Sequence, residues 1–128
     1  DNVNFPSNIR VEFPSTETKK FIYEETANFT CYLIFKMLYD NIANLSTWSS
    51  TKRNICTNKN LLIIGLGNIG LRVRNKMTPF IKNIFTYDIL TNDKPPDYNK
   101  ADIISLHIPY CTENKDFINK NNLNQFKS

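Results

Sequence analysis

The chain has 128 residues, a formal net charge of +4 and 41% hydrophobic residues. This length supports one domain with a buried core, and its lysines are scattered rather than gathered with aromatic residues, which argues against nucleic-acid binding. The longest apolar stretch, residues 31–38, contains Lys36 and is too short to span a membrane.

The first third of the chain predicts one short strand and one long helix. Residues 1–20 contain two prolines and a strand candidate at residues 9–13. A helix is predicted from about Phe21 to Leu45, because apolar residues recur at helical spacing: Ala27, Cys31, Ile34, Phe35 and Leu38. This helix is apolar around most of its circumference, so we expect a second surface to cover it, as at an interface.

All three glycines of the chain lie at residues 65–70, directly after the apolar run at residues 61–64. Their spacing, G-x-G-x-x-G, has a mechanical meaning where a strand runs into a helix. The first glycine makes the tight turn, the second lets a pyrophosphate approach the backbone, and the third lets the helix pack closely. The phosphates then bind N–H groups at the helix N-terminus. The predicted binding residues are Gly65, Leu66, Gly67, Asn68, Ile69 and Gly70.

The helix that follows is predicted from Asn68 to Met77 and ends before Pro79. The spacing of its apolar residues turns Ile69 and Val73 toward a sheet. Its basic residues are expected to face solvent: Arg72, Arg74 and Lys76.

A second strand, predicted at residues 83–87, ends in Asp88, which lies 18 residues after Gly70. A dinucleotide fold places an acid that binds the adenosine ribose at about this interval. Alone, Asp88 would be interpreted as an ordinary turn residue. The order of strand, glycine turn, helix, strand and acid favours the ribose-binding role, and an acid there repels a 2′-phosphate, so NAD is predicted rather than NADP.

A third strand is predicted at residues 101–108, after a polar stretch at residues 91–100. Its apolar centre is typical of a parallel strand covered on both faces. Together the elements predict an α/β fold with a Rossmann-type doubly wound parallel sheet. A helix is predicted to begin near Asn119, with Leu123 and Phe126 as its apolar positions, and the sheet is expected to be incomplete at the C-terminal end.

The cysteines and the one histidine predict no metal site. Cys31, Cys56 and Cys111 are an odd number without a C-x-x-C pair, and His107 adds no recognisable ligand spacing. Without a visible secretory signal, this pattern favours a reducing cytoplasm.

Taken together, these segments resemble the D-isomer-specific 2-hydroxyacid dehydrogenases. Residues 9–11 resemble the last strand of that family's substrate domain, and residues 26–28 resemble the opening of its long interdomain helix. Trp48 resembles the tryptophan that follows this helix. The fingerprint at residues 63–70, the strand at residues 85–88 and the segment at residues 101–109 are similar to its nucleotide-binding motifs. Asn28 stands where the family has an acid, and Cys111 where it has a threonine.

The resemblance implies three parts and further cofactor-binding residues. Residues 1–20 would be the tail of the substrate domain and the crossover, residues 21–60 the interdomain helix and connection, and residues 61–128 a truncated NAD-binding core. The additional residues beside NAD would be Tyr87, His107, Ile108 and Pro109. The parent protein would act on a small 2-hydroxy or 2-oxo acid and form a homodimer through its nucleotide domains, with no nucleic-acid or membrane partner.

The family's catalytic arginine, glutamate and histidine would all lie beyond Ser128, so no catalytic residue is assigned and this chain is expected to be inactive alone. His107 could instead serve as a catalytic base, oriented by Glu113, but a structural or cofactor-lining role is favoured. Two other interpretations stay open: a dinucleotide-sensing module such as a corepressor, and a short nucleotide-binding subunit completed by a partner chain. We expect the chain to be cut at both ends.

Overall fold

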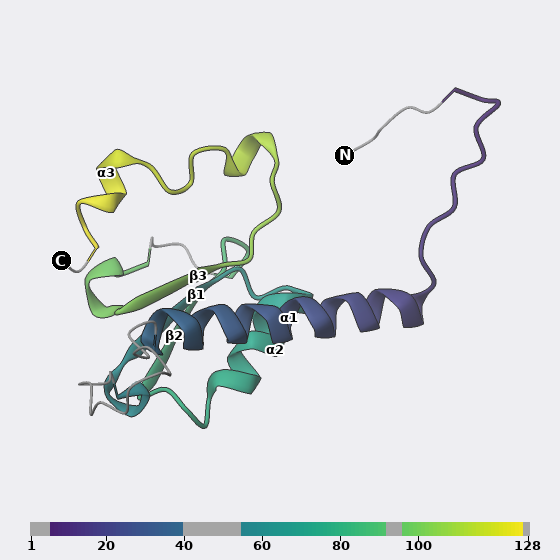
Figure 1. Ribbon diagram of the computed structural model, residues 1–128. Coiled ribbons are helices and arrows are strands. Elements are labelled where there is room, and N and C mark those ends of the chain that lie inside the picture. Colours follow the sequence, from purple (N-terminus) through teal and green to yellow (C-terminus); the bar gives the residue numbers. More distant parts are fainter. Residues whose placement is uncertain (1–5, 40–54, 92–95, 127–128) are drawn as a thin grey trace, which may run out of the picture.

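The computed structural model describes residues 6–39, 55–91 and 96–126 (Figure 1). Helices and strands alternate from residue 60 onward, as the sequence predicted. In chain order the elements are α1 (Thr16–Tyr39), η1 (Cys56–Asn58), β1 (Asn60–Ile64), α2 (Asn68–Met77), β2 (Asn83–Tyr87), η2 (Tyr98–Lys100), β3 (Ile103–Leu106), η3 (Thr112–Asn114) and α3 (Lys120–Leu123).

The three strands form a parallel sheet in the order β2-β1-β3. Leu61 in the central strand pairs with Ile84 of β2 on one side and with Ile103 of β3 on the other. The chain therefore moves in one direction from β1 to β2 and then crosses to the opposite side for β3. Such a reversal of strand order is where doubly wound sheets bind ligands, outside the carboxyl ends of the strands. The predicted fold class is confirmed.

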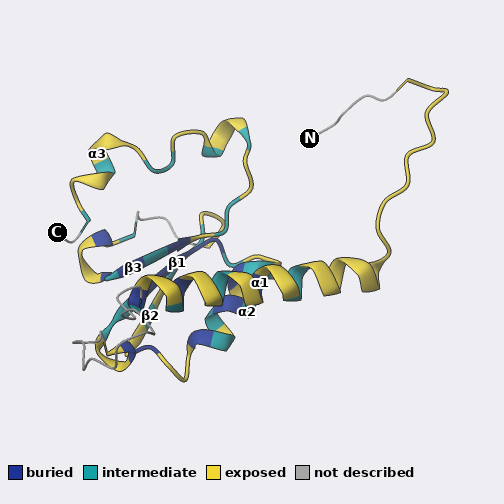
Figure 2. Cartoon of the chain, viewed as in Figure 1, coloured by how far each residue is buried: buried dark blue, intermediate teal, exposed yellow. Residues whose placement is uncertain are grey.

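Helices α1 and α2 cover one face of the sheet. Because strand side chains alternate between the two faces, Leu61 and Ile63 of β1 point toward these helices, and both are fully buried. They pack with buried residues of α1 and α2: Ala27, Ile34, Leu38, Val73 and Met77. Figure 2 colours buried residues dark blue.

The opposite face receives Leu62 and Ile64, and irregular segments cover it. Tyr98 and Ala101 are buried there. The C-terminal segment runs back over this side (Figure 1), and the Phe126 ring lies 4.8 Å from that of Tyr98. β1 is thus covered on both faces, which explains its unbroken run of apolar residues.

Helix α1 begins at Thr16, so the predicted start at Phe21 is wrong by more than one turn. The cause is Ser15, whose Oγ accepts a hydrogen bond from the Thr18 N–H at 3.1 Å in the manner of an N-cap. The predicted end at Leu45 lies outside the described residues, as does Trp48. The expectation that this helix is apolar on several sides is confirmed by its exposed residues: Phe21, Ile22, Phe29, Tyr32, Leu33 and Met37.

The strand predicted at residues 9–13 is wrong. Residues 9–15 carry no regular secondary structure, all of them are exposed, and the segment stands away from the sheet (Figure 1). The alternation of Ile9, Val11 and Phe13 is that of a strand, but a strand requires hydrogen bonds to a neighbour. None of the three sheet strands lies beside it.

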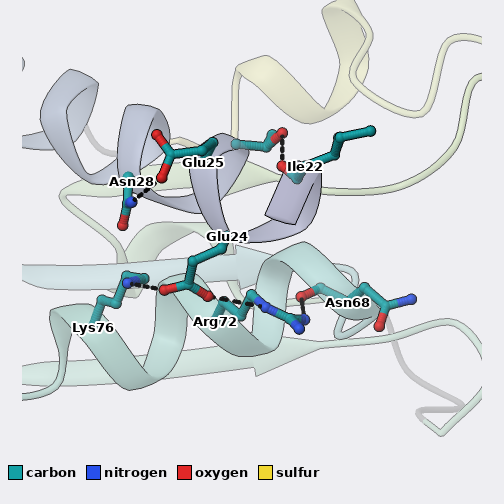
Figure 3. Close-up of polar contacts among 8 residues, drawn as sticks. Ile22, Glu24, Glu25, Asn28, Asn68, Arg72 and Lys76 are labelled. Carbon is teal, nitrogen blue, oxygen red and sulfur yellow. Dashed lines mark hydrogen bonds and ion pairs between the residues drawn. The ribbon is translucent and has the colours of Figure 1, made fainter. Parts of the chain in front are cut away.

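Helix α2 has the predicted bounds, but two of its basic residues do not face solvent as expected. Arg72 and Lys76 are half-buried and pair with Glu24 of α1 (Figure 3). Residues four apart share a helix face, and this face of α2 lies against α1.

The third strand is shorter than predicted, and the last helix ends before the second of its two predicted apolar positions. Ala101 closes the η2 turn and Asp102 accepts a hydrogen bond from the Asn60 N–H at 2.9 Å, so β3 begins at Ile103. Asn119 forms a capping box with Asn122 at the start of α3, which then spans four residues. The predicted apolar position Leu123 is 49% exposed, whereas Phe126 packs on the sheet.

Candidate functional site

The groups predicted to bind a dinucleotide meet at the carboxyl edge of the sheet. The Gly65 N–H donates to the Tyr87 carbonyl at 2.7 Å, which joins the glycine turn to the end of β2. The His107 N–H donates to the Ile64 carbonyl at 2.7 Å, which joins the end of β3 to the same turn. Three segments separated in the sequence therefore form one continuous edge.

Two glycines are required by the packing of the chain itself. Gly65 has a φ of +92°, and a Cβ on it would lie 2.5 Å from the carbonyl oxygen of His107. A Cβ on Gly70 would overlap the carbonyl oxygen of Gly65. The first glycine therefore allows the tight turn and the third allows α2 to approach it, as the spacing predicted.

Gly67 is different, because nothing in the described chain crowds it. A Cβ there would meet no atom within 4 Å, and its φ of −72° is accessible to any residue. It directly precedes α2, and no side chain caps that helix. The first N–H groups of a helix lack intrahelical acceptors and carry partial positive charge. The space in front of Gly67 thus suits an anionic group lying close to the backbone.

Asp88 is held beside this turn by two backbone groups. One carboxylate oxygen accepts a hydrogen bond from the Leu66 N–H at 2.7 Å, and the other accepts one from the Leu90 N–H at 2.9 Å. These bonds, the Leu66 bond foremost, lower the pKa of the Asp88 carboxyl below its ordinary value. The side chain is therefore an oriented anion at neutral pH, as a hydrogen-bond acceptor for ribose hydroxyls must be.

On the other side of the turn lies a cavity of about 660 Å³. It is bounded by α1, by the glycine turn with the start of α2, and by β3 with the residues that follow it. Three hydroxyl-bearing residues of α1 and a largely apolar wall from β3 line it. The lining residues are Tyr23, Thr26, Thr30, Leu33, Ile34, Met37, Gly67, Asn68, Ile69, Ile103, Ile104, Ser105, Leu106, His107, Ile108 and Pro109.

Residues 67–69 and 107–109, which the sequence predicted to bind the cofactor, line this cavity, and the contribution of α1 was not predicted. Tyr23, Thr26 and Thr30 lie three and four residues apart, which places these three hydroxyl-bearing residues on one face of α1. That spacing was the available signal. It could not show which part of the sheet this face crosses.

His107 lies half-buried in the wall of the cavity. Its Nε2 is 2.9 Å from the Ser105 Oγ, the hydrogen bond that its ring makes within the described chain. Burial lowers the pKa of the imidazole, so it is neutral at pH 7. Glu113, the carboxylate considered as its orienting partner, is exposed, and hydrogen bonding to its own backbone and to Cys111 lowers the pKa of its carboxyl. The arrangement supports a lining role rather than a base.

Metal ligation and membrane insertion receive no support from the described residues. Among them, no group of three or more His, Cys, Asp or Glu side chains could hold a metal ion. None of their helices combines the length and apolar character needed to cross a membrane.

The donor set fits a dinucleotide. Three features lie along one edge of the sheet: a backbone turn open to an anion, an ionised acid beside the end of β2, and a cavity beside the end of β3. A dinucleotide presents a pyrophosphate between two nucleoside halves, which would extend to the two sides of this turn.

Comparison with known proteins supports this interpretation. The profile of the family described as "D-isomer specific 2-hydroxyacid dehydrogenase, NAD binding domain" matches residues 37–128. The aromatic 2-oxoacid reductases of two Clostridium sporogenes strains are 35% identical over 81 residues, covering 55% of this chain and 24% of the relative. The chain thus spans about a quarter of the length of the curated relatives it matches.

Two solved structures show the same fold. The D-lactate dehydrogenase of Aquifex aeolicus, complexed with NAD and lactic acid, superposes with a TM-score of 0.69 at 25% identity, covering 82% of this chain and 37% of that one. The NAD-dependent formate dehydrogenase of Staphylococcus aureus, in complex with NAD, gives a TM-score of 0.70 at 19% identity, with the same two coverages. The second likeness concerns the fold alone.

Proposed function

The chain belongs to the D-isomer-specific 2-hydroxyacid dehydrogenase family, in its NAD-binding domain, and from this premise we propose that it binds NAD(H) at the carboxyl edge of its sheet. The parent protein would be an oxidoreductase that transfers hydride between NAD(H) and a D-2-hydroxy acid or the corresponding 2-oxo acid. The relatives named as 2-oxoacid reductases support this substrate class.

One observation carries the proposal: the open space at Gly67, in front of the uncapped N-terminus of α2. The backbone from Gly67 to Ile69 would hold the pyrophosphate, while Gly65 and Gly70 keep the turn tight. Leu66 contributes by fixing Asp88 through its N–H. Bulk at Gly67 would exclude a phosphate with little disturbance of the fold, because a Cβ there meets no protein atom within 4 Å.

Asp88 and Tyr87 would lie at the adenosine side. The Asp88 carboxylate would accept hydrogen bonds from the ribose hydroxyls and repel the 2′-phosphate of NADP. On the other side of the turn, Ile108 and Pro109 would border the cofactor together with His107, whose neutral imidazole is held by Ser105.

When bound, NAD supplies the carbon that accepts or gives the hydride. The residues of this chain bind and orient the dinucleotide, and the apolar wall of β3 keeps water from part of the cavity. The chain has no arginine after Arg74, so no guanidinium stands where the resembling family binds a substrate carboxylate. We propose that this chain alone does not turn over. The same proposal includes the division of the chain into three parts, with boundaries at residues 20 and 60. It also includes a homodimer formed through α1 and a cytoplasmic location.

Titration with NADH and NADPH, followed by the change in nicotinamide fluorescence, tests the assignment. The unmodified protein should bind NADH more tightly than NADPH, and Asp88→Asn should narrow the difference because the repelling charge is lost. A preference for NADPH in the unmodified protein would contradict the role of Asp88. Absence of binding to either cofactor would contradict the function itself.

The dinucleotide-sensing alternative uses the same site without chemistry. It is not favoured, because the matched relatives are reductases.

A further inference from the structure

A single carboxylate on α1 meets two cations on α2. One oxygen of Glu24 lies 3.2 Å from the Arg72 Nε, and the other lies 2.5 Å from the Lys76 Nζ. Figure 3 shows Glu24 between the two basic side chains, which lie one helical turn apart. All three side chains are partly shielded from solvent, with 29% to 46% of their surfaces exposed.

Arg72 has two further partners that fix its direction. Its Nη1 donates to the carbonyl oxygen of Asn68 at 2.5 Å, and its Cζ lies 5.7 Å from the centroid of the Tyr23 ring. Asn68 is the first residue of α2 and follows Gly67 directly. The guanidinium is therefore folded back along α2 toward the turn proposed to hold the pyrophosphate. A planar guanidinium held by a carboxylate, a carbonyl and an aromatic ring has little freedom to leave this position.

This placement is unfavourable for the helix alone. The N-terminus of a helix carries partial positive charge, so a cation beside it is repelled and an anion is attracted. α2 has three basic residues and no acidic one. Glu24 offsets one of its two facing cations, and a net positive charge remains. An anion bound in front of Gly67 would complete the charge balance.

We propose that Arg72 is an auxiliary binding residue for the pyrophosphate of the dinucleotide, acting through its charge, and that Glu24 and Tyr23 position it. The inference rests on the proposed function, because it assigns a further residue to the same site. It concerns binding only and assigns Arg72 no part in hydride transfer.

The test is NADH binding by fluorescence titration of the full chain, at low and at high salt. Arg72→Gln should weaken binding about three- to tenfold at low salt, and the difference should shrink at high salt, because a partly exposed charge is screened. Arg74→Gln is the matched control. It removes the same charge from the same helix, but its position is two residues away and so faces the opposite direction. Its affinity should stay within about twofold of the unmodified protein.

Arg72 also docks α1 onto α2, so a second variant separates charge from packing. Arg72→Lys keeps the charge but cannot bond Glu24 and Asn68 with one planar group. It should retain most of the affinity that Arg72→Gln loses, even if urea unfolding without cofactor shows that both variants are less stable. If Arg72→Lys and Arg72→Gln lose the same amount of NADH affinity, the inference is overturned. It is also overturned if Arg72→Gln and Arg74→Gln bind NADH with equal affinity. If the unmodified protein binds NADH, either result leaves the proposed function standing, whereas no binding by the unmodified protein would overturn both.

Discussion

Replacing Gly65 by alanine tests whether the tight turn after β1 depends on glycine. Gly65 has a φ of +92°, in the left-handed region, where a residue with a Cβ costs about 1–2 kcal/mol. The new Cβ would also lie 2.5 Å from the His107 carbonyl oxygen. That backbone must move, and such overpacking adds about 1–3 kcal/mol. We therefore expect Gly65→Ala to lower the free energy of unfolding by roughly 2–5 kcal/mol.

Gly67→Ala supplies the matched comparison two residues away. Its φ of −72° suits alanine, and the added Cβ meets no atom within 4 Å. Reduced freedom of the unfolded chain should stabilise this variant by about 0.4–1 kcal/mol, and the poorer N-cap should cost a similar amount. The net change should lie within about 1 kcal/mol of zero. Urea unfolding followed by circular dichroism measures both variants. Equal destabilisation by the two substitutions would refute the assignment of the strained position to Gly65.

Three further outcomes are expected. The purified chain should not oxidise NADH with glyoxylate, pyruvate or hydroxypyruvate, and measurable turnover would make His107 a catalytic candidate again. The pKa of the Glu24 carboxyl is lowered below its ordinary value of 4.5, chiefly by hydrogen bonding to Lys76. The contribution of Glu24 to stability is therefore present above pH 4.5 and is lost as the pH falls through the lowered pKa. The stability difference between the unmodified protein and Glu24→Gln in urea unfolding should accordingly shrink as the pH falls below 4.5, and a constant difference would contradict the ion pair. Met37→Glu should weaken a dimer measured by sedimentation more than Lys36→Gln, which lowers the net charge equally, and identical behaviour would exclude this face of α1 from the interface.

The unit from β1 to Asp88 could be predicted from the sequence because its signals are local. The glycine spacing requires a strand before it and a helix after it, and the observed bounds of α2 and β2 are those predicted. The start of β3 was predicted too early because the contact that precedes it, the hydrogen bond between Asp102 and Asn60, joins residues 42 positions apart.

The remaining errors also concern long-range packing. The segment at residues 9–13 has the alternation of a strand, yet no described strand pairs with it. Arg72 and Lys76 were assigned to solvent because Glu24, their partner, lies 48 and 52 positions earlier. Tyr23 and Thr26 of α1 line the cavity only because α1 runs past β3. The spacing of residues along a helix does not determine that path.

The central claim is that the backbone in front of α2, opened by Gly67, binds the pyrophosphate of NAD(H). A titration of Gly67→Val with NADH, beside the unmodified protein, tests it most directly. The added side chain should abolish detectable binding while the urea midpoint without cofactor changes little, because a Cβ at this position meets no protein atom within 4 Å. Undiminished NADH affinity in a folded Gly67→Val protein would contradict the claim.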